Sequence, residues 1–293
     1  MLSSLNPGLL YAALAYTLWG LFPLFFKRLH TVGPLEVVLH RVVWSLVFVL
    51  LVLAVLKRWA WLRAALRTPR VVGTFALSAT LLTGNWLTYI WAVNNDHVLD
   101  ASLGYFILPL VNVGLGFVFL HERPRRVQWL AFSIACAGVA WLTFQAGHVP
   151  WVALALALTF GLYGLLRKLA PLGALEGLSL ETLLLAPFAL AVLVWMSWSG
   201  QGALAHHDTS VLAWLVLAGP VTAIPLLLFA AGARRIPLSM MGILQYIAPS
   251  ILVLLGAWLY DEPFAGPRVA GFALIWTALV VYSVEGWLVS RTA

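Results

Sequence analysis

The chain repeats itself at an offset of 140 residues. At that offset Leu35-Glu36 aligns with Leu175-Glu176, and further matches are Pro109 with Pro249, Gly116 with Gly256 and Glu122 with Glu262. Two copies of one unit, each about half of a very apolar chain, are typical of membrane transporters built from duplicated halves. We therefore expect a first unit over residues 1–146 and a second unit over residues 147–293.

The composition points to a lipid environment. The chain is 63% hydrophobic and only 9% charged, whereas a soluble chain averages roughly 25% charged residues. Its 15 Trp, 15 Phe and 8 Tyr suit a protein with two membrane interfaces. The basic residues are spread between apolar runs, so we expect the bilayer as a partner and not nucleic acid. A single cysteine, Cys136, excludes an internal disulfide and a Cys-based zinc cage, and no cofactor is expected.

Ten apolar stretches are long enough to cross a hydrocarbon core of roughly 30 Å. All connections between them are short, which leaves no room for an enzyme domain outside the membrane. The fold class that we expect is an all-α polytopic membrane protein with ten transmembrane helices. The stretches are 8–26, 35–56, 71–93, 98–120, 127–145, 149–167, 177–198, 211–233, 237–259 and 268–288.

The loops between these stretches alternate in charge. One side carries 13 of the 17 basic residues, and the other carries Lys27, Arg28 and Arg268. The positive-inside rule then predicts that both termini are cytoplasmic. The 13 are Lys57, Arg58, Arg63, Arg67, Arg70, Arg123, Arg125, Arg126, Arg167, Lys168, Arg234, Arg235 and Arg291.

Each half holds five stretches, an odd number, so the second half is expected to be inverted relative to the first. Loop 57–70 contains five basic residues, while its equivalent 197–210 contains no Lys or Arg. Inversion predicts that contrast. The ten helices are thus expected to form two inverted five-helix repeats.

Arg41 and Glu181 align at the same offset and both lie inside predicted helices. A charge near the bilayer centre costs about 2.5–3.5 kcal/mol, so both need a reason to be there. Each lies about 10 Å deep, from opposite faces. We expect a polar cavity in which Arg41 attracts an anionic or carbonyl-bearing substrate and Glu181 contacts a cation or carries a proton. A structural ion pair, or an Arg41 that reaches the interface, is the alternative.

Polar residues share faces of two neighbouring helices. Asn85, Thr88 and Tyr89 have i, i+3, i+4 spacing, and Asn85 and Tyr105 are expected at the depth of Arg41. The second face carries Ser102, Tyr105, Pro109 and Asn112. These side chains are candidates for substrate binding, and inter-helix hydrogen bonding is the alternative.

Four further candidates come from single positions. Gln245 and Tyr246 are expected in a smaller polar layer near Glu181, on the cytoplasmic side. His40 is a candidate for proton coupling because histidine titrates near neutral pH; packing is the alternative. Trp19 is a candidate for stacking on an aromatic or apolar substrate, since Gly20 and Pro23 suggest a bend beside it.

Six stretches spread along the chain form a recognisable set. They are Tyr16-Thr-Leu-Trp-Gly20, Leu35-Glu-Val-Val-Leu-His-Arg41, Asn85-Trp-Leu-Thr-Tyr-Ile-Trp-Ala-Val-Asn-Asn95, Ala101-Ser-Leu-Gly-Tyr-Phe106, Gly219-Pro-Val-Thr222 and Leu244-Gln-Tyr-Ile-Ala-Pro249. On these stretches the chain resembles the RarD-type branch of the EamA division of the drug/metabolite transporter superfamily, over nearly its whole length. The resemblance implies ten helices in inverted halves, the bacterial inner membrane, and export or exchange of small organic solutes by alternating access.

The sequence therefore predicts a secondary active transporter, and not an enzyme. Its substrate is expected to be an amino-acid-like or aromatic, amphipathic solute, with drugs such as phenicols also considered, and its direction export. A passive facilitator or channel remains an alternative, and an intramembrane enzyme a weaker one.

Gly114, Gly116 and Gly256 permit close helix approach, either in the core or at a homodimer seam.

Overall fold

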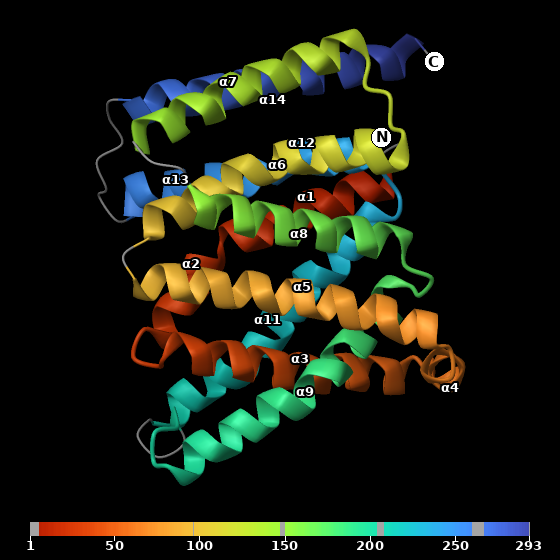
Figure 1. Cartoon of the computed structure of the whole chain (residues 1–293), viewed down its shortest axis with the longest axis vertical. Helices are drawn as coiled ribbons and strands as arrows, with labels where there is room; N and C mark the ends of the chain where they lie inside the picture. The colour runs from red at the N-terminus through yellow and green to blue at the C-terminus, as the bar shows by residue number, and fades with distance from the viewer. Residues whose placement is uncertain (1–5, 96, 147–149, 204–207, 260–266, 293) are drawn as a thin grey trace.

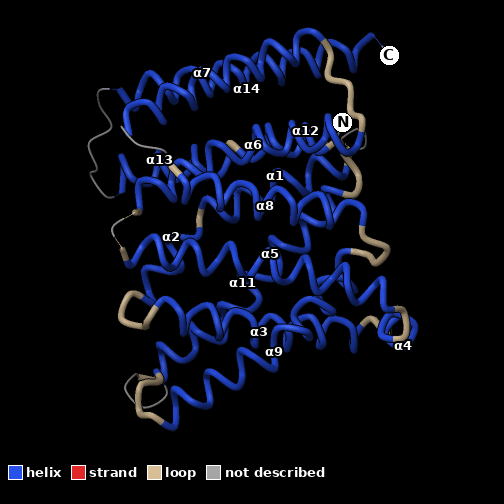
Figure 2. The backbone as a smooth tube through the Cα atoms, viewed as in Figure 1, coloured by secondary structure: helices blue, strands red, loops and turns tan. Residues whose placement is uncertain are grey.

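The computed structural model describes all residues except 1–5, 96, 147–149, 204–207, 260–266 and 293. The described residues form helices and no strand (Figure 2). The helices are α1 (Pro7–Gly20), α2 (Phe22–Phe26), the short 3-10 helix η1 (Lys27–Leu29), α3 (Pro34–Val55), α4 (Ala60–Leu66), α5 (Pro69–Asn94), α6 (Val98–Leu120), α7 (Arg126–Ala146), α8 (Trp151–Leu169), α9 (Ala174–Trp198), α11 (Thr209–Ala233), α12 (Leu238–Gln245), α13 (Ile247–Leu259) and α14 (Pro267–Thr292).

The prediction of an all-α polytopic membrane protein is confirmed. Among the described residues, nine helical segments are long and apolar enough to cross a membrane. The tenth expected helix is α5, whose 26 residues lie between α3 and α8 in Figure 1. Asn85 and several threonines make α5 less apolar than its neighbours. Three of its polar residues, Asn85, Thr88 and Tyr89, are ones that the sequence marks as candidates for a site.

Two expected helices are broken in the structure. The first bends at Leu21, where α1 gives way to α2, two residues before Pro23. The ninth breaks at Tyr246, between α12 and α13, three residues before Pro249. Proline removes a backbone donor and crowds the preceding turn, so each break lies where the chain cannot continue its hydrogen bonding undisturbed.

The helices run roughly alongside one another, with α7 and α14 paired at one edge and α3 and α9 near the other (Figure 1). Both chain ends and α4 lie at the same end of this bundle. We call it the termini end, and the other the opposite end. The candidate residue Arg41 follows the start of α3 by seven residues and so lies toward the opposite end.

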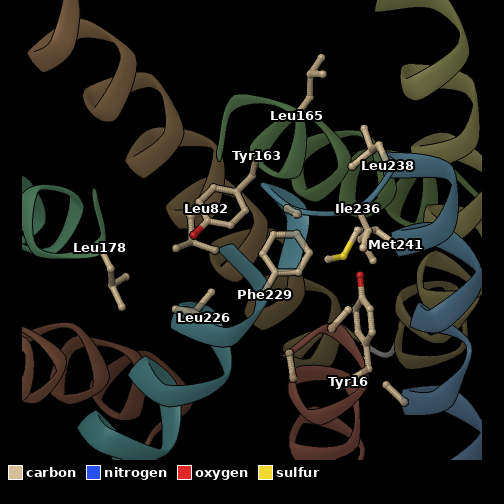
Figure 3. Packing of buried hydrophobic residues seen from close by; sticks show 14 of the residues in the cluster. Tyr16, Leu82, Tyr163, Leu165, Leu178, Leu226, Phe229, Ile236, Leu238 and Met241 are labelled. Atoms are coloured by element: carbon tan, nitrogen blue, oxygen red, sulfur yellow. The ribbon is translucent and has the colours of Figure 1, made fainter. Parts of the chain in front are cut away.

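Glycine and aromatic residues hold the centre together. A Cβ on Gly219 of α11 would collide with the backbone of Trp44, so α3 and α11 pack at backbone distance, and Ser45 Oγ donates to the Gly219 carbonyl at 3.0 Å. Close approach of this kind replaces the hydrophobic driving force that lipid does not supply. Figure 3 shows Tyr16, Tyr163 and Phe229 converging in the largest buried cluster.

Candidate functional site

Arg41 lies at a junction of five helices. Its Nε donates to Thr222 Oγ1 of α11 at 2.9 Å. The guanidinium carbon lies 4.7 Å from the ring centre of Trp86 on α5, and 5.2 and 5.9 Å from the ring centres of Phe26 and Phe22 on α2. Cation–π contacts of this kind contribute about 0.5–2 kcal/mol each, and they hold the charged group in place without neutralising it.

Two tyrosines complete the surroundings of Arg41. Tyr89 of α5 and Tyr105 of α6 both lie within electrostatic range of the guanidinium. They are 41% and 39% exposed, so neither ring is packed away in the protein interior. Arg41, Tyr89 and Tyr105, with Thr222, form what we call the Arg41 cluster. The sequence placed Asn85 and Tyr105 at the depth of Arg41, and Tyr89 on the helix face of Asn85; in the structure Tyr89 and Tyr105 lie near Arg41.

Asn85 lies on the same helix as Tyr89 but points to α8. Its amide nitrogen donates to the Leu156 carbonyl at 2.9 Å and to Thr159 Oγ1 at 3.0 Å. This is the inter-helix bonding that the sequence left as the alternative. The amide group of Asn85 therefore fastens α5 to α8 in this conformation.

Asn112, Gln245 and Tyr246 lie apart from the Arg41 cluster. Asn112 of α6 donates to Gln245 Oε1 of α12 at 3.0 Å, and both side chains are buried. The hydroxyl of Tyr246 donates to the Phe106 carbonyl of α6 at 3.2 Å. The described side-chain hydrogen bonds of Gln245 and Tyr246 are thus with α6, and not with Glu181 as the sequence suggested.

Trp19 belongs to an aromatic cluster in the middle of the bundle. Its ring centre lies 5.6 Å from those of Tyr16, Phe160 and Phe229. Tyr16 and Phe229 are fully buried, while Trp19 and Phe160 are partly exposed. Ser102 lies in α6, but its side chain falls outside the part of the chain that the structure describes.

His40 points away from Arg41, toward its own helix. Its Nδ1 accepts from Trp44 Nε1 at 3.2 Å, and its Nε2 lies 3.8 Å from Glu36 Oε1. Glu36 in turn accepts from the backbone nitrogen of Ala203 at 2.6 Å. His40 is therefore linked through Glu36 to the loop after α9, at the opposite end of the bundle.

Glu181 forms a second polar cluster, near the termini end. Its carboxylate accepts from Ser78 Oγ at 2.5 Å and from the Tyr163 hydroxyl at 3.4 Å, and lies 3.6 Å from Arg167 Nη1. Glu181 and Arg167 are 0% and 1% exposed. The sequence leaves a direct pair between Glu181 and Arg41 open; the carboxylate pairs instead with Arg167, which the charge pattern counts among the basic loop residues. We call these four residues the Glu181 cluster.

At the termini end, several hydrogen bonds surround the start of α12. Glu122, in the loop after α6, accepts from the backbone nitrogens of Leu238 and Ser239 at 2.6 and 2.9 Å and from Ser239 Oγ at 2.7 Å. Lys168 donates to the carbonyls of Ala233 and Ile236. An acidic side chain at a helix N-terminus satisfies free backbone donors, so these contacts fasten α12 in place.

Sequence reasoning missed Thr222 and Arg167, and it preferred Trp19 to Trp86 among the tryptophans deep in their helices. Thr222 stands in the quoted Gly219–Thr222 stretch, and Trp86 follows Asn85, but no spacing rule links either to Arg41. Arg167 ends an apolar run, where basic residues usually face water. Its burial depends on a partner 14 residues later in the chain.

These features describe a multi-pass membrane protein with polar and charged groups held inside its helical bundle. Residues 6–144 match the EamA-like transporter family. The chain is 45% identical to an uncharacterized transporter of Pseudomonas aeruginosa over 97% of this chain and 96% of that protein. It is also 45% identical to the protein RarD of Streptomyces exfoliatus, covering 98% and 90%. A solved crystal structure, 19% identical, shares the fold with a TM-score of 0.71 over 96% of this chain and 98% of that one.

The chain belongs to the RarD-type branch of the EamA-like transporter family, so it is a membrane transporter of the drug/metabolite type. The resemblance drawn from its sequence is confirmed.

Proposed function

We propose that the protein is a secondary active transporter that exports a small organic metabolite across the bacterial inner membrane by alternating access. The substrate is an amino-acid-like or an aromatic, amphipathic solute. It binds between two inverted halves, residues 1–146 and 147–293. The observation that carries this proposal is the Arg41 cluster, a membrane-embedded cation with exposed tyrosine rings beside it and without a described carboxylate partner.

The contrast between the two ends of the bundle supports an alternating-access cycle. At the termini end Glu122 and Lys168 fasten the start of α12, and Ile236 is 2% exposed. Toward the opposite end Tyr89 and Tyr105 keep two-fifths of their surface exposed. With the 13 basic loop residues taken as cytoplasmic, both termini are cytoplasmic and this conformation is accessible from outside.

Reciprocal contacts support the inverted halves. Helices equivalent at the offset of 140 make equivalent pairs: α1 packs on α11 as α8 packs on α5, while α3 packs on α9 and α7 on α14. Glu36 at the start of α3 binds the loop after α9, and Glu176 at the start of α9 pairs with Arg58 after α3. Such exchange of equal contacts is what a two-fold axis in the membrane plane produces.

The remaining candidates receive separate roles in this proposal. Asn85, Asn112, Gln245 and Tyr246 line or brace the substrate path, with Ser102 and Trp19 as further contacts. The Glu181 cluster carries the coupling proton, with His40 as a second candidate. Charged groups inside membrane helices commonly mark such relays.

The test begins with a thermal-shift screen of purified protein against amino acids, nucleosides and phenicols, because a ligand stabilises the folded form that binds it. Each hit is then assayed in proteoliposomes with and without a proton-motive force. Accumulation against a gradient that requires the force supports a coupled transporter, and equilibration alone would indicate a passive facilitator.

Arg41→Ala is expected to abolish transport of the hit while the protein remains folded and inserted. Arg70→Ala, a change of an exposed arginine on α5, is the matched control and is expected to leave transport intact. Normal transport by Arg41→Ala would refute the assignment of the site.

A further inference from the structure

Arg41 differs from Arg167, Arg125 and Arg58 because no described carboxylate pairs with it. Arg167 pairs with Glu181, Arg125 with Glu285, and Arg58 with Glu176. In the part of the chain that the structure describes, the guanidinium of Arg41 donates one hydrogen bond, from Nε to the neutral oxygen of Thr222. Among the described residues nothing therefore compensates its charge inside a membrane helix, where an isolated charge is costly.

The aromatic neighbours of Arg41 cannot supply that compensation. Trp86, Phe26 and Phe22 offer ring faces at 4.7, 5.2 and 5.9 Å, which attract a cation but carry no net charge. They place apolar ring surface on the sides of the guanidinium that they face. A low-polarity surround strengthens the attraction between the guanidinium and any anion that reaches it.

The orientation of Arg41 is fixed by Thr222. Because Nε is engaged, the guanidinium plane is set, and Nη1 and Nη2 remain as a pair of donors. Two parallel N–H groups in this fork match the two oxygens of a carboxylate. Tyr89 and Tyr105 lie within electrostatic range of the same group, and a tyrosine hydroxyl can donate a further hydrogen bond to an anion.

We propose that the substrate of this site is a carboxylate anion with an apolar body, bound by the Nη1 and Nη2 donors of Arg41 and by the hydroxyls of Tyr89 and Tyr105. The apolar body lies against the aromatic rings around the guanidinium. The inference rests on the proposed transport function and specifies the class of substrate. Thr222 acts as a positioning residue, since it touches Arg41 and orients the fork.

The test compares probes that share one carbon skeleton and differ in charge. Purified protein in detergent is titrated with 3-phenylpropionate, 3-phenylpropionamide and 3-phenylpropylamine at millimolar concentrations, and the midpoint of thermal unfolding is recorded. The carboxylate is expected to raise the midpoint, and the neutral amide and the amine are not. In Arg41→Gln the shift is expected to disappear, while the midpoint without ligand identifies any loss of folding.

Five further variants refine the assignment. Arg41→Lys keeps the charge but removes the fork, so 3-phenylpropionate is expected to bind about tenfold more weakly. Tyr89→Phe and Tyr105→Phe keep the rings, and each is expected to weaken binding of the carboxylate by a similar factor. Thr222→Ser keeps the hydroxyl, so its affinity for 3-phenylpropionate is expected to be unchanged. Thr222→Val lacks the acceptor for Arg41 Nε and is expected to bind 3-phenylpropionate more weakly.

Several results would overturn the inference. One is an absence of any shift with 3-phenylpropionate, and another is an equal shift in Arg41→Gln. A shift of the same size with inorganic phosphate or phosphatidylglycerol would assign the anion to a phosphate group instead. An Arg41-dependent shift with the amide or the amine would reject the carboxylate while leaving the transport function standing, because a ligand would still bind at Arg41.

Discussion

Arg167 of α8 and Glu181 of α9 form an ion pair within the helical bundle, with 3.6 Å between Arg167 Nη1 and Glu181 Oε1. Each side chain is 1% exposed. Ser78 and Tyr163 donate to the carboxylate, and Arg167 Nη2 donates to the Ala174 carbonyl at 3.0 Å. Arg167 Nε and Nη1 have no described hydrogen-bond acceptor. The two opposite charges therefore compensate each other, but Nε and Nη1 of Arg167 remain without a described acceptor.

Glu181→Gln is expected to destabilise the protein by about 3–5 kcal/mol, because it leaves the Arg167 guanidinium buried and uncompensated. The double variant with Arg167→Met is expected to recover part of that loss, since it removes the orphaned charge. The measurement is the free energy of unfolding of the purified variants in detergent.

The matched control for Glu181→Gln is Glu176→Gln. Glu176 pairs with Arg58 at 2.5 Å, but the Arg58 side chain is 58% exposed and can be solvated when its partner is lost. The expected loss for this pair is about 1 kcal/mol or less. Equal losses of unfolding free energy in the two variants would contradict the view that burial makes the protein sensitive to loss of the Glu181 carboxylate.

Gly177→Ala is expected to disturb the Glu181 cluster from the backbone side. A Cβ at Gly177 would collide with Arg167 Nη1 and would lie 2.7 Å from Phe75 Cε1. Overpacking of this kind costs about 1–3 kcal/mol. Thermal unfolding of the purified variant measures the loss.

Gly84→Ala in α5 serves as the comparison for Gly177→Ala. A Cβ at Gly84 meets nothing within 4 Å, and alanine is the better helix former by about 1 kcal/mol. This variant is expected to be as stable as the parent or slightly more so. If both glycine variants lose stability alike, the cause is not the contact with Arg167.

The fold was largely predictable from the sequence because length and hydropathy alone limit what a membrane helix can be. The stretch expected at 98–120 is helix α6, Val98–Leu120, and the breaks at Leu21 and Tyr246 lie close to prolines. Some helix ends differ from the predicted ones: α9 begins at Ala174, three residues before the predicted stretch. There the helix extends beyond the apolar residues, and hydropathy detects only the apolar part.

The candidate site was predictable only in part. Depth placed Tyr105 near Arg41, and helical spacing placed Tyr89 on the face of Asn85, since both follow from the geometry of a helix. The same rules gave Asn85 a substrate role, although its amide is engaged by α8. A polar group in a membrane helix can bind either a substrate or a neighbouring helix. For Asn85, only the packing of α5 against α8 distinguishes these two roles.

Asn112 and Gln245 are expected to contribute to stability as a coupled pair. Their hydrogen bond of 3.0 Å joins α6 to α12, and both side chains are buried. A double-mutant cycle with Asn112→Ala and Gln245→Ala should give a coupling of about 0.5–2 kcal/mol, the range found for hydrogen bonds between membrane helices. Additive losses in unfolding free energy would show that the two amides act independently.

Glu122→Ala is expected to open the termini end. Glu122 supplies three hydrogen bonds to Leu238 and Ser239, and its loss frees the start of α12, which packs next to the buried Ile236. Accessibility is read from the rate at which a maleimide labels Ile236→Cys. The background is Cys136→Ser, because the native Cys136 is exposed. Within this background, Ile236→Cys should be labelled faster when Glu122→Ala is also present than when Glu122 is retained.

The control for this labelling experiment is Glu285→Ala, which removes a carboxylate bound to Arg125 at 2.7 Å between α7 and α14 but leaves the bonds of Glu122 intact. Its labelling rate should match that of the parent, because the start of α12 keeps its acceptor. If Glu122→Ala also labels at the parent rate while remaining folded, the hydrogen bonds of Glu122 do not hold the termini end closed. The barrier would then lie in the aromatic packing of Tyr16, Tyr163 and Phe229.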